Sequence, residues 1–132
     1  MFREKYEISI WEDFFVPAET EQQLDGSYIV KSPSYYDERK LAIIGSDTLE
    51  SQSRAVDPKL VRNANGTNTL TFKMFYHYVD NITGEEVDNP FIGLLTNERK
   101  VKCFWKNKWY DLLIKNVQED SSGKSITYTC KD

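Results

Sequence analysis

The sequence predicts an all-β domain, a sandwich or a partly closed barrel, with one short helix near residues 89–97. Aromatic residues make up 14% of the 132 residues, and aromatic side chains favour strands. The second half of the chain alternates apolar and polar residues over several short runs, and turn-forming residues separate these runs. Residues 1–132 are therefore expected to form a single β domain with its own hydrophobic core.

In the first half, the alternation of residues 6–11 predicts a strand that residues 14–16 extend. Residues 17–40 are polar and contain two prolines and a glycine, which predicts a long loop insertion with one short strand at 27–31. Such a long connection is typical of a functional loop or of a segment that a partner orders. Another short strand is predicted at 41–44.

The second half predicts a strand-rich body with one helical turn. Asn89 and Pro90 indicate the start of a short helix, because asparagine caps free backbone donors and proline suits the first helical position. Phe91, Leu94 and Leu95 then fall at helical spacing and are expected to face the sheet. The predicted strands are 56–62, 69–76, 100–105, 110–115 and 125–130, with turns at 63–67, 80–85, 106–108 and 119–123.

The net charge of −4 is too mild to indicate a nucleic-acid partner. A basic stretch from Arg99 to Lys115 predicts a solvated face of the sheet, with an acidic protein partner as the alternative. No apolar run is long enough to indicate a membrane partner, and residues 1–5 lack the apolar core of a signal peptide. Synthesis in the cytoplasm of a host cell is therefore expected.

The sequence predicts no catalytic, cofactor-binding or metal-binding residues. His77 is the only histidine, and no glutamate or cysteine stands at ligand spacing from it, so a structural role is expected. The 6 glycines are spread singly, which argues against a phosphate-binding loop. Neighbouring acids diverge on a strand and indicate solvation, although a glycosidase pair stays open. These pairs are Glu12–Asp13, Glu85–Glu86 and Glu119–Asp120.

The two cysteines, Cys103 and Cys130, are expected to be buried free thiols, and a disulfide stays open if their strands are neighbours. Two glycosylation sequons, at 65–67 and 81–83, fall in predicted turns and are attributed to turn chemistry.

Three tryptophans suggest two alternative roles. Trp105 and Trp109 flank the predicted turn at 106–108, and Trp11 lies in the first strand. They are interpreted as cross-strand pairs that fix hairpin register, with a sugar-binding platform as the alternative.

Four segments of the sequence carry a resemblance to a known family. They are NGTNTLTF at 65–72 (after a strand from Pro58), NPFIGLLTNERKV at 89–101, WYDLLIK at 109–115 and TYTCKD at 127–132. Together they resemble the N-terminal region of tail hub proteins from phages of Gram-positive bacteria, the tail-associated lysin and prophage tail endopeptidase group. The resemblance covers residues 6–11 and 41–132, whereas 17–40 do not match and are interpreted as an insertion.

This resemblance implies a structural virion protein of a phage tail tip or baseplate hub, and no enzyme activity in this chain. In the family, such a domain builds a homotrimeric ring that binds the distal tail or tail-tube proteins above. Below, it carries tail fibre, lysin or other baseplate parts. The strand that runs to Asp132 also predicts a domain cut from a longer chain. The resemblance implies that a catalytic (lysin) domain or a receptor-binding domain follows in such a chain. Residues 17–40 are expected to contact a neighbouring subunit. The alternatives are a carbohydrate-binding module for a cell-surface glycan and, third, an enzyme fragment.

Overall fold

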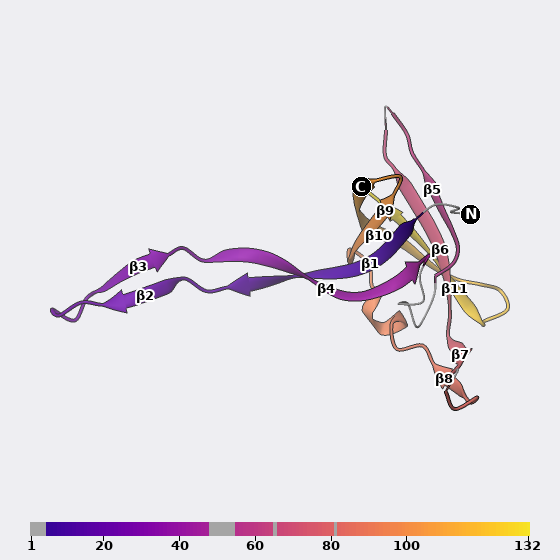
Figure 1. Ribbon diagram of the computed structural model, residues 1–132, viewed down its shortest axis with the longest axis horizontal. Coiled ribbons are helices and arrows are strands. Elements are labelled where there is room, and N and C mark those ends of the chain that lie inside the picture. Colours follow the sequence, from indigo (N-terminus) through magenta and orange to yellow (C-terminus); the bar gives the residue numbers. More distant parts are fainter. Residues whose placement is uncertain (1–4, 48–54, 65, 81) are drawn as a thin grey trace.

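The structure is a computed structural model that describes residues 5–47, 55–64, 66–80 and 82–132 (Figure 1). It is almost entirely β, as the sequence predicts, and the one helical segment of these residues is a single 3₁₀ turn. The elements are β1 Tyr6–Val16, β2 Glu19–Gln22, β3 Tyr28–Ser32, β4 Tyr35–Ser46, β5 Val56–Val61, β6 Thr69–Phe75, β7 His77–Val79, β8 Glu86–Asp88, η1 Ile92–Leu94, β9 Lys100–Trp105, β10 Lys108–Glu119 and β11 Ser125–Lys131.

Seven of the strands form one antiparallel sheet in the order β4-β1-β9-β10-β11-β6-β5. The sheet curls so that its two outer strands approach each other. Ala55, just before β5, donates its backbone N–H to the carbonyl of Ile44 in β4 at 2.5 Å. The sheet thus folds over its own core without closing into a barrel, and we call this part of the molecule the body.

The core of the body follows the period-two alternation of the sequence. Leu70, Phe72 and Met74 in β6 are at most 1% exposed, because alternate side chains of a strand point to one face. Phe72 lies opposite Tyr128 in β11, and the two rings stack with centroids 5.3 Å apart. Replacing such a buried aromatic side chain by alanine costs roughly 3–5 kcal/mol, so this pair stabilises the core where β11 and β6 meet.

The predicted helix near 89–97 is the short 3₁₀ turn η1. The Asn89 side chain accepts a hydrogen bond from the backbone N–H of Phe91 at 3.1 Å, which forms a turn just before η1, but the N-cap of η1 is Phe91 and no side chain caps it, so the predicted capping by Asn89 is wrong. Two backbone bonds follow, from Leu94 N–H to Phe91 and from Leu95 N–H to Ile92, and the chain then leaves the helical path. Leu95 is 3% exposed, and Phe91 and Leu94 pack partly buried against the core, as their spacing predicts.

The outer strand β5 is protected against pairing with a further strand. Its register against β6 shifts between Val56 and Lys59, where Asp57 has a φ of 50° and Pro58 has no N–H to donate. A bulge and a proline are common protections of an edge strand.

The first hairpin of the chain extends well beyond the body (Figure 1). β9 pairs with β1 only from Tyr6 to Trp11, while β1 and β4 stay paired as far as Val16 and Tyr35. β2 and β3 then continue the hairpin outward. We call residues 12–39 the arm and residues 19–32 its tip segment.

The arm corrects the prediction of a loop insertion at about 17–40. The predicted short strand at 27–31 is present as β3, but β2 and the outer part of β4 pair as well. Both faces of the arm are open to solvent, so its sequence has no buried face to mark with alternation. Pro17 and Pro33 interrupt the pairing between the β1–β4 and β2–β3 ladders, because proline lacks a backbone donor.

Candidate interaction arm and basic cap

The arm exposes large apolar side chains that have no core to cover. Tyr36 is 74% exposed, Tyr28 66% and Leu24, at the turn, fully exposed. The one ring pair along it, Phe15 with Tyr36, has centroids 5.4 Å apart and remains open to solvent. The exposed apolar residues of the arm are Phe15, Leu24, Tyr28, Ile29, Val30, Tyr35 and Tyr36. These side chains are distributed over both faces of the arm, so the arm exposes apolar surface that its own chain does not cover.

The turn at the end of the arm has an ordered geometry. Gln23 and Ser27 are joined by a backbone bond of 2.6 Å, and Gly26 adopts a φ of +87° that favours glycine. The Asp25 carboxylate accepts hydrogen bonds from the N–H and hydroxyl of Ser27, which lower the pKa of Asp25. The tip segment holds the acids Glu19, Glu21 and Asp25 and one base, Lys31. Three acids and one base give it a net charge of −2.

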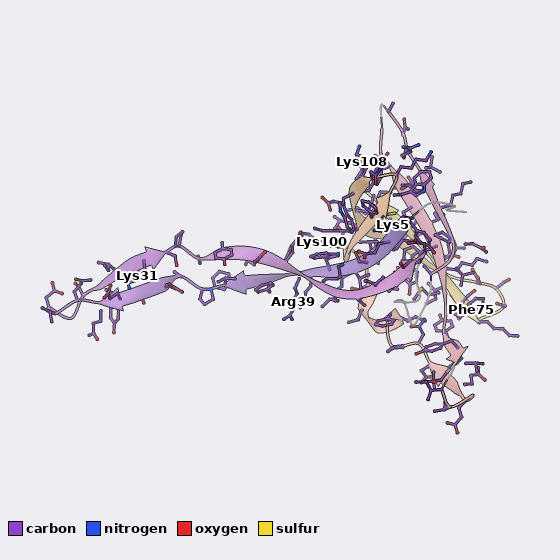
Figure 2. All side chains as sticks on the ribbon, in the orientation of Figure 1. Lys5, Lys31, Arg39, Phe75, Lys100 and Lys108 are labelled. Atoms are coloured by element: carbon purple, nitrogen blue, oxygen red, sulfur yellow. The ribbon has the colours of Figure 1, made fainter. Side chains whose placement is uncertain are left out.

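An ion-pair network joins the base of the arm to the sheet around Lys100, which Figure 2 labels where the arm meets the body. Lys100 Nζ in β9 lies 2.7 Å from Asp13 Oδ1 in β1 and 3.2 Å from Glu38 Oε2 in β4. Lys102 also pairs with Glu38. The hydrogen bonds from Lys102 and Lys100 lower the pKa of Glu38. The hydrogen bonds that Lys100 donates to Asp13 and Glu38 in turn raise the pKa of Lys100.

The network changes the interpretation of the basic stretch from Arg99 to Lys115. Four of its cations face acids of the same chain, since Arg99 pairs with Glu12, Lys115 with Glu98, and Lys100 and Lys102 with the arm. These four cations therefore have acidic partners within the chain, while an acidic protein partner for the stretch stays a prediction. The other two cations, Lys106 and Lys108, lie at the β9–β10 turn.

Lys106 and Lys108, together with Arg62, cover one end of the body. Arg62 Cζ and Lys106 Nζ lie 4.9 Å and 4.7 Å from the centre of the Trp105 ring, and Lys108 Nζ lies 5.1 Å from that of Tyr110. All three cations are exposed, and within the described residues none of them forms an ion pair. We call Arg62, Lys106 and Lys108 the basic cap.

The three tryptophans lie in three separate environments. Trp105 lies opposite Lys108, and Trp109 lies opposite Phe104, so the two indoles point to opposite faces of the hairpin. Trp109 forms a cross-strand pair with Phe104, with ring centroids 5.1 Å apart. Lys102 Nζ lies 4.3 Å from the centre of the Trp11 ring, and the Trp11 indole donates its N–H to the Ser9 hydroxyl at 2.8 Å. Trp105 and Trp109 therefore do not form one sugar-binding platform.

His77 lies in the small β7–β8 hairpin, where its Nδ1 is 2.8 Å from Asp88 Oδ1. Both side chains are exposed, and they line an open hollow of about 520 Å³ with Tyr76 and Glu119. The described residues that line this hollow include no serine, threonine or cysteine, so they supply no aliphatic hydroxyl or thiol for this His–Asp pair to activate. The prediction that the chain has no catalytic residue stays a prediction.

The neighbouring acids belong to separate contacts. Glu12 pairs with Arg39 and Arg99, whereas Asp13 pairs with Lys100 on the other face of β1. Asp120 accepts hydrogen bonds from the hydroxyls of Ser125 and Thr127. These bonds, together with the nearby positive charge of Lys73, lower the pKa of Asp120. Glu86 lies in β8, next to the β7–β8 turn, and Glu85 precedes it. The paired acids therefore form ion pairs between strands or hydrogen bonds beside a turn.

Cys103 and Cys130 are fully buried free thiols, as predicted. β10 lies between their strands β9 and β11, which excludes a disulfide in this fold. Burial raises the pKa of each thiol to about 12.

Three further features of the sequence analysis concern metal binding, membrane spans and the two sequons. No group of three or more histidine, cysteine or acidic side chains gathers for a metal ion within the described residues. In that same part of the chain, no helix is long and apolar enough to span a membrane. Asn65 and Asn81, the acceptors of the two sequons, lie outside the described residues, as does 48–54.

No protein-family model, curated protein or solved structure matches the chain. The resemblance to tail hub proteins therefore stays a prediction, and the functional argument rests on the arm and the basic cap.

Proposed function

We propose that the chain is a structural subunit of a homo-oligomeric ring, in which the arm of each copy binds its neighbour. The observation that carries this proposal is the arm itself. A two-stranded hairpin is at best marginally stable in water, and this one leaves both faces and both edges of β2–β3 uncovered. Docking on a neighbour would bury its aromatic residues and pair its free edges.

The ring that we propose is part of a phage tail tip or baseplate hub. The sequence resemblance supports this assignment, with a trimer as the expected number and distal tail and fibre proteins as neighbours. The body supplies a rigid sheet with a protected outer strand at β5, which suits a subunit whose contacts must be limited to defined surfaces.

Removal of the arm tests the proposal. Val16 and Tyr35 lie directly opposite each other, so replacing residues 17–34 by Asn-Gly joins them through a two-residue turn. We expect the wild-type chain to sediment as an oligomer and the shortened chain as a folded monomer. The proposal fails if the shortened chain assembles like the wild type, or if the wild type stays monomeric at every concentration. Immunogold labelling of virions tests the location, and label away from the tail tip contradicts it.

A carbohydrate-binding module is the second candidate. The observation that favours it is Trp109, which is half exposed and lines a hollow of about 310 Å³ with Lys5, Glu7 and Asp47. An aromatic face beside polar groups is the usual arrangement for binding a sugar ring. Binding of a cell-surface glycan that is lost in Trp109→Ala and kept in Trp11→Ala would favour this function.

A further inference from the structure

We propose that the tip segment of one copy docks on the basic cap of the next copy, in a head-to-tail contact between acid and base. This inference rests on the proposed function and names the surface that receives the arm. Figure 1 shows the arm pointing away from the body, and Figure 2 places Lys31 of the arm far from Lys108 of the basic cap. The tip segment of a chain therefore does not reach that chain's own cap, and the contact is intermolecular.

Charge complementarity is the first argument. The tip segment carries a net charge of −2, from three acids and one base, and the cap carries three cations. The single base, which this net charge already counts, pairs inside the segment, with Lys31 Nζ 3.4 Å from Glu21 Oε2. Opposed charged surfaces steer association and fix its orientation.

The chemistry of the two surfaces also matches beyond charge. The cap cations lie over Trp105 and Tyr110, so the cap presents cationic groups held on an aromatic base. In the tip segment, Ile29 is about half exposed and lies opposite Glu21, so an apolar side chain shares a face with an acid, while Tyr28 and Val30 point to the other face. An interface of this composition combines ion pairs with apolar burial, as is typical of binding surfaces rich in tyrosine and arginine.

The backbone at Lys106 is the second argument. Lys106 and Asn107 have φ values of 51° and 59°, which makes the β9–β10 turn a two-residue turn of the kind that prefers Asn-Gly. A lysine in this conformation is strained relative to asparagine or glycine. Strain at an exposed position points to a functional reason for the side chain, and the cation of the cap is that reason here.

A head-to-tail contact uses two different surfaces of each copy. Such a contact produces a ring if its rotation closes and a filament if it does not. The inference thus supplies the geometry that a ring of identical subunits requires.

Charge reversal on the full chain tests the inference. In the triple variant Arg62→Glu, Lys106→Glu, Lys108→Glu, we expect the dissociation constant of self-association to rise by about tenfold or more. The same is expected for Glu19→Lys, Glu21→Lys in the tip segment. A chain that carries all five reversals should assemble again, because acid and base have only exchanged places. The readout is sedimentation velocity at several protein concentrations and two salt concentrations.

The matched control is Glu85→Lys, Glu86→Lys, which makes the same charge change beside the β7–β8 turn. We expect this control to assemble like the wild type. The inference is overturned if the control weakens assembly as much as the tip variant, or if the five reversals do not restore it. It is also overturned if the triple variant assembles normally while the shortened arm abolishes assembly, and in that case the proposed function stands.

Cross-linking provides a readout that does not depend on the folding of any variant. Carbodiimide treatment of a mixture of ¹⁴N- and ¹⁵N-labelled wild-type chains should join Glu19, Glu21 or Asp25 to Lys106 or Lys108 in mixed-isotope pairs. Cross-links from the tip segment to other lysines alone would overturn the inference. Binding of a single-stranded oligonucleotide by the cap, without any effect of cap variants on assembly, would assign the cap to nucleic acid and overturn it as well.

Discussion

At the scale of single residues, the β9–β10 turn shows a conflict between local conformation and charge. Lys106 adopts a left-handed conformation that asparagine adopts more easily. We predict that Lys106→Asn raises the free energy of unfolding by up to ~1 kcal/mol, measured by urea denaturation of the monomeric, shortened-arm chain.

The control for this prediction is Lys108→Asn, which removes the same charge from a strand position. It should not stabilise the domain, because asparagine is a poor strand former. A loss of stability in Lys106→Asn would show that the turn does not strain its lysine.

Glu38 gives a residue-scale prediction about pH. Hydrogen bonds from Lys102 and Lys100 lower the pKa of Glu38, so the folded state binds its proton less readily than the unfolded chain. The resulting stabilisation is present above the usual carboxylate pKa and is lost as the pH falls through the lowered value. The side chain is one-third exposed, so solvent screening limits the effect to less than about 1 kcal/mol.

We therefore predict that Glu38→Gln lowers stability at neutral pH and leaves it nearly unchanged in acid, measured by urea unfolding at a series of pH values. Glu19→Gln serves as the control, since no lysine or arginine of the described residues faces Glu19. An equal loss of stability for Glu38→Gln at both ends of the pH range would contradict the assigned role.

At the scale of elements, the sequence predicts the strands of the body well and the arm poorly, for one physical reason. In the body one face of each strand is buried, so Leu70, Phe72 and Met74 must alternate with polar residues. The arm buries neither face, and its pairing depends on backbone bonds that leave no hydrophobic period. Polar residues with Pro17 and Pro33 then resemble a loop.

The predicted helix shows the limit of local signals. Asn89 accepts a bond from Phe91 ahead of η1 but does not cap it, and one turn suffices to bring Leu95 into the core, so the chain needs no longer helix there.

The arm gives a prediction about element stability. The tip segment has few neighbours, so its backbone hydrogen bonds should open easily in the free subunit. We predict that amide protons of β2 and β3 exchange with solvent much faster than those of β6 and β11 in the monomer, and become protected on assembly. Hydrogen–deuterium exchange with mass spectrometry at low and high protein concentration measures this difference. Slow exchange of β2 and β3 in the monomer would mean that the arm is stable without a partner.

At the scale of the whole molecule, the candidate site depends on strand register more than on composition. The sequence identifies the basic stretch from Arg99 to Lys115 but does not sort its members. The register of β9 against β1 places Lys100 and Lys102 beside the acids of the arm, while the β9–β10 turn leaves Lys106 and Lys108 on the cap. Arg62 joins them only through the fold, because the β5–β6 connection returns to the same end of the body.

The shape of the whole molecule allows a direct prediction for the free subunit. The arm adds length in one direction without adding a core (Figure 1), so the monomer should scatter as a compact body with a thin extension. Small-angle X-ray scattering should then give a pair-distance distribution with a long tail, and the variant with residues 17–34 replaced by Asn-Gly should lose that tail. The ion pairs of Lys100 with Asp13 and Glu38 should hold the arm in this direction, since they tie β1 and β4 to β9 at its base. Lys100→Met should therefore broaden the tail while leaving the compact part unchanged. A wild-type distribution without a tail would show that the arm folds back on the body, and the exposed faces that we assign to a neighbour would then be covered within one chain.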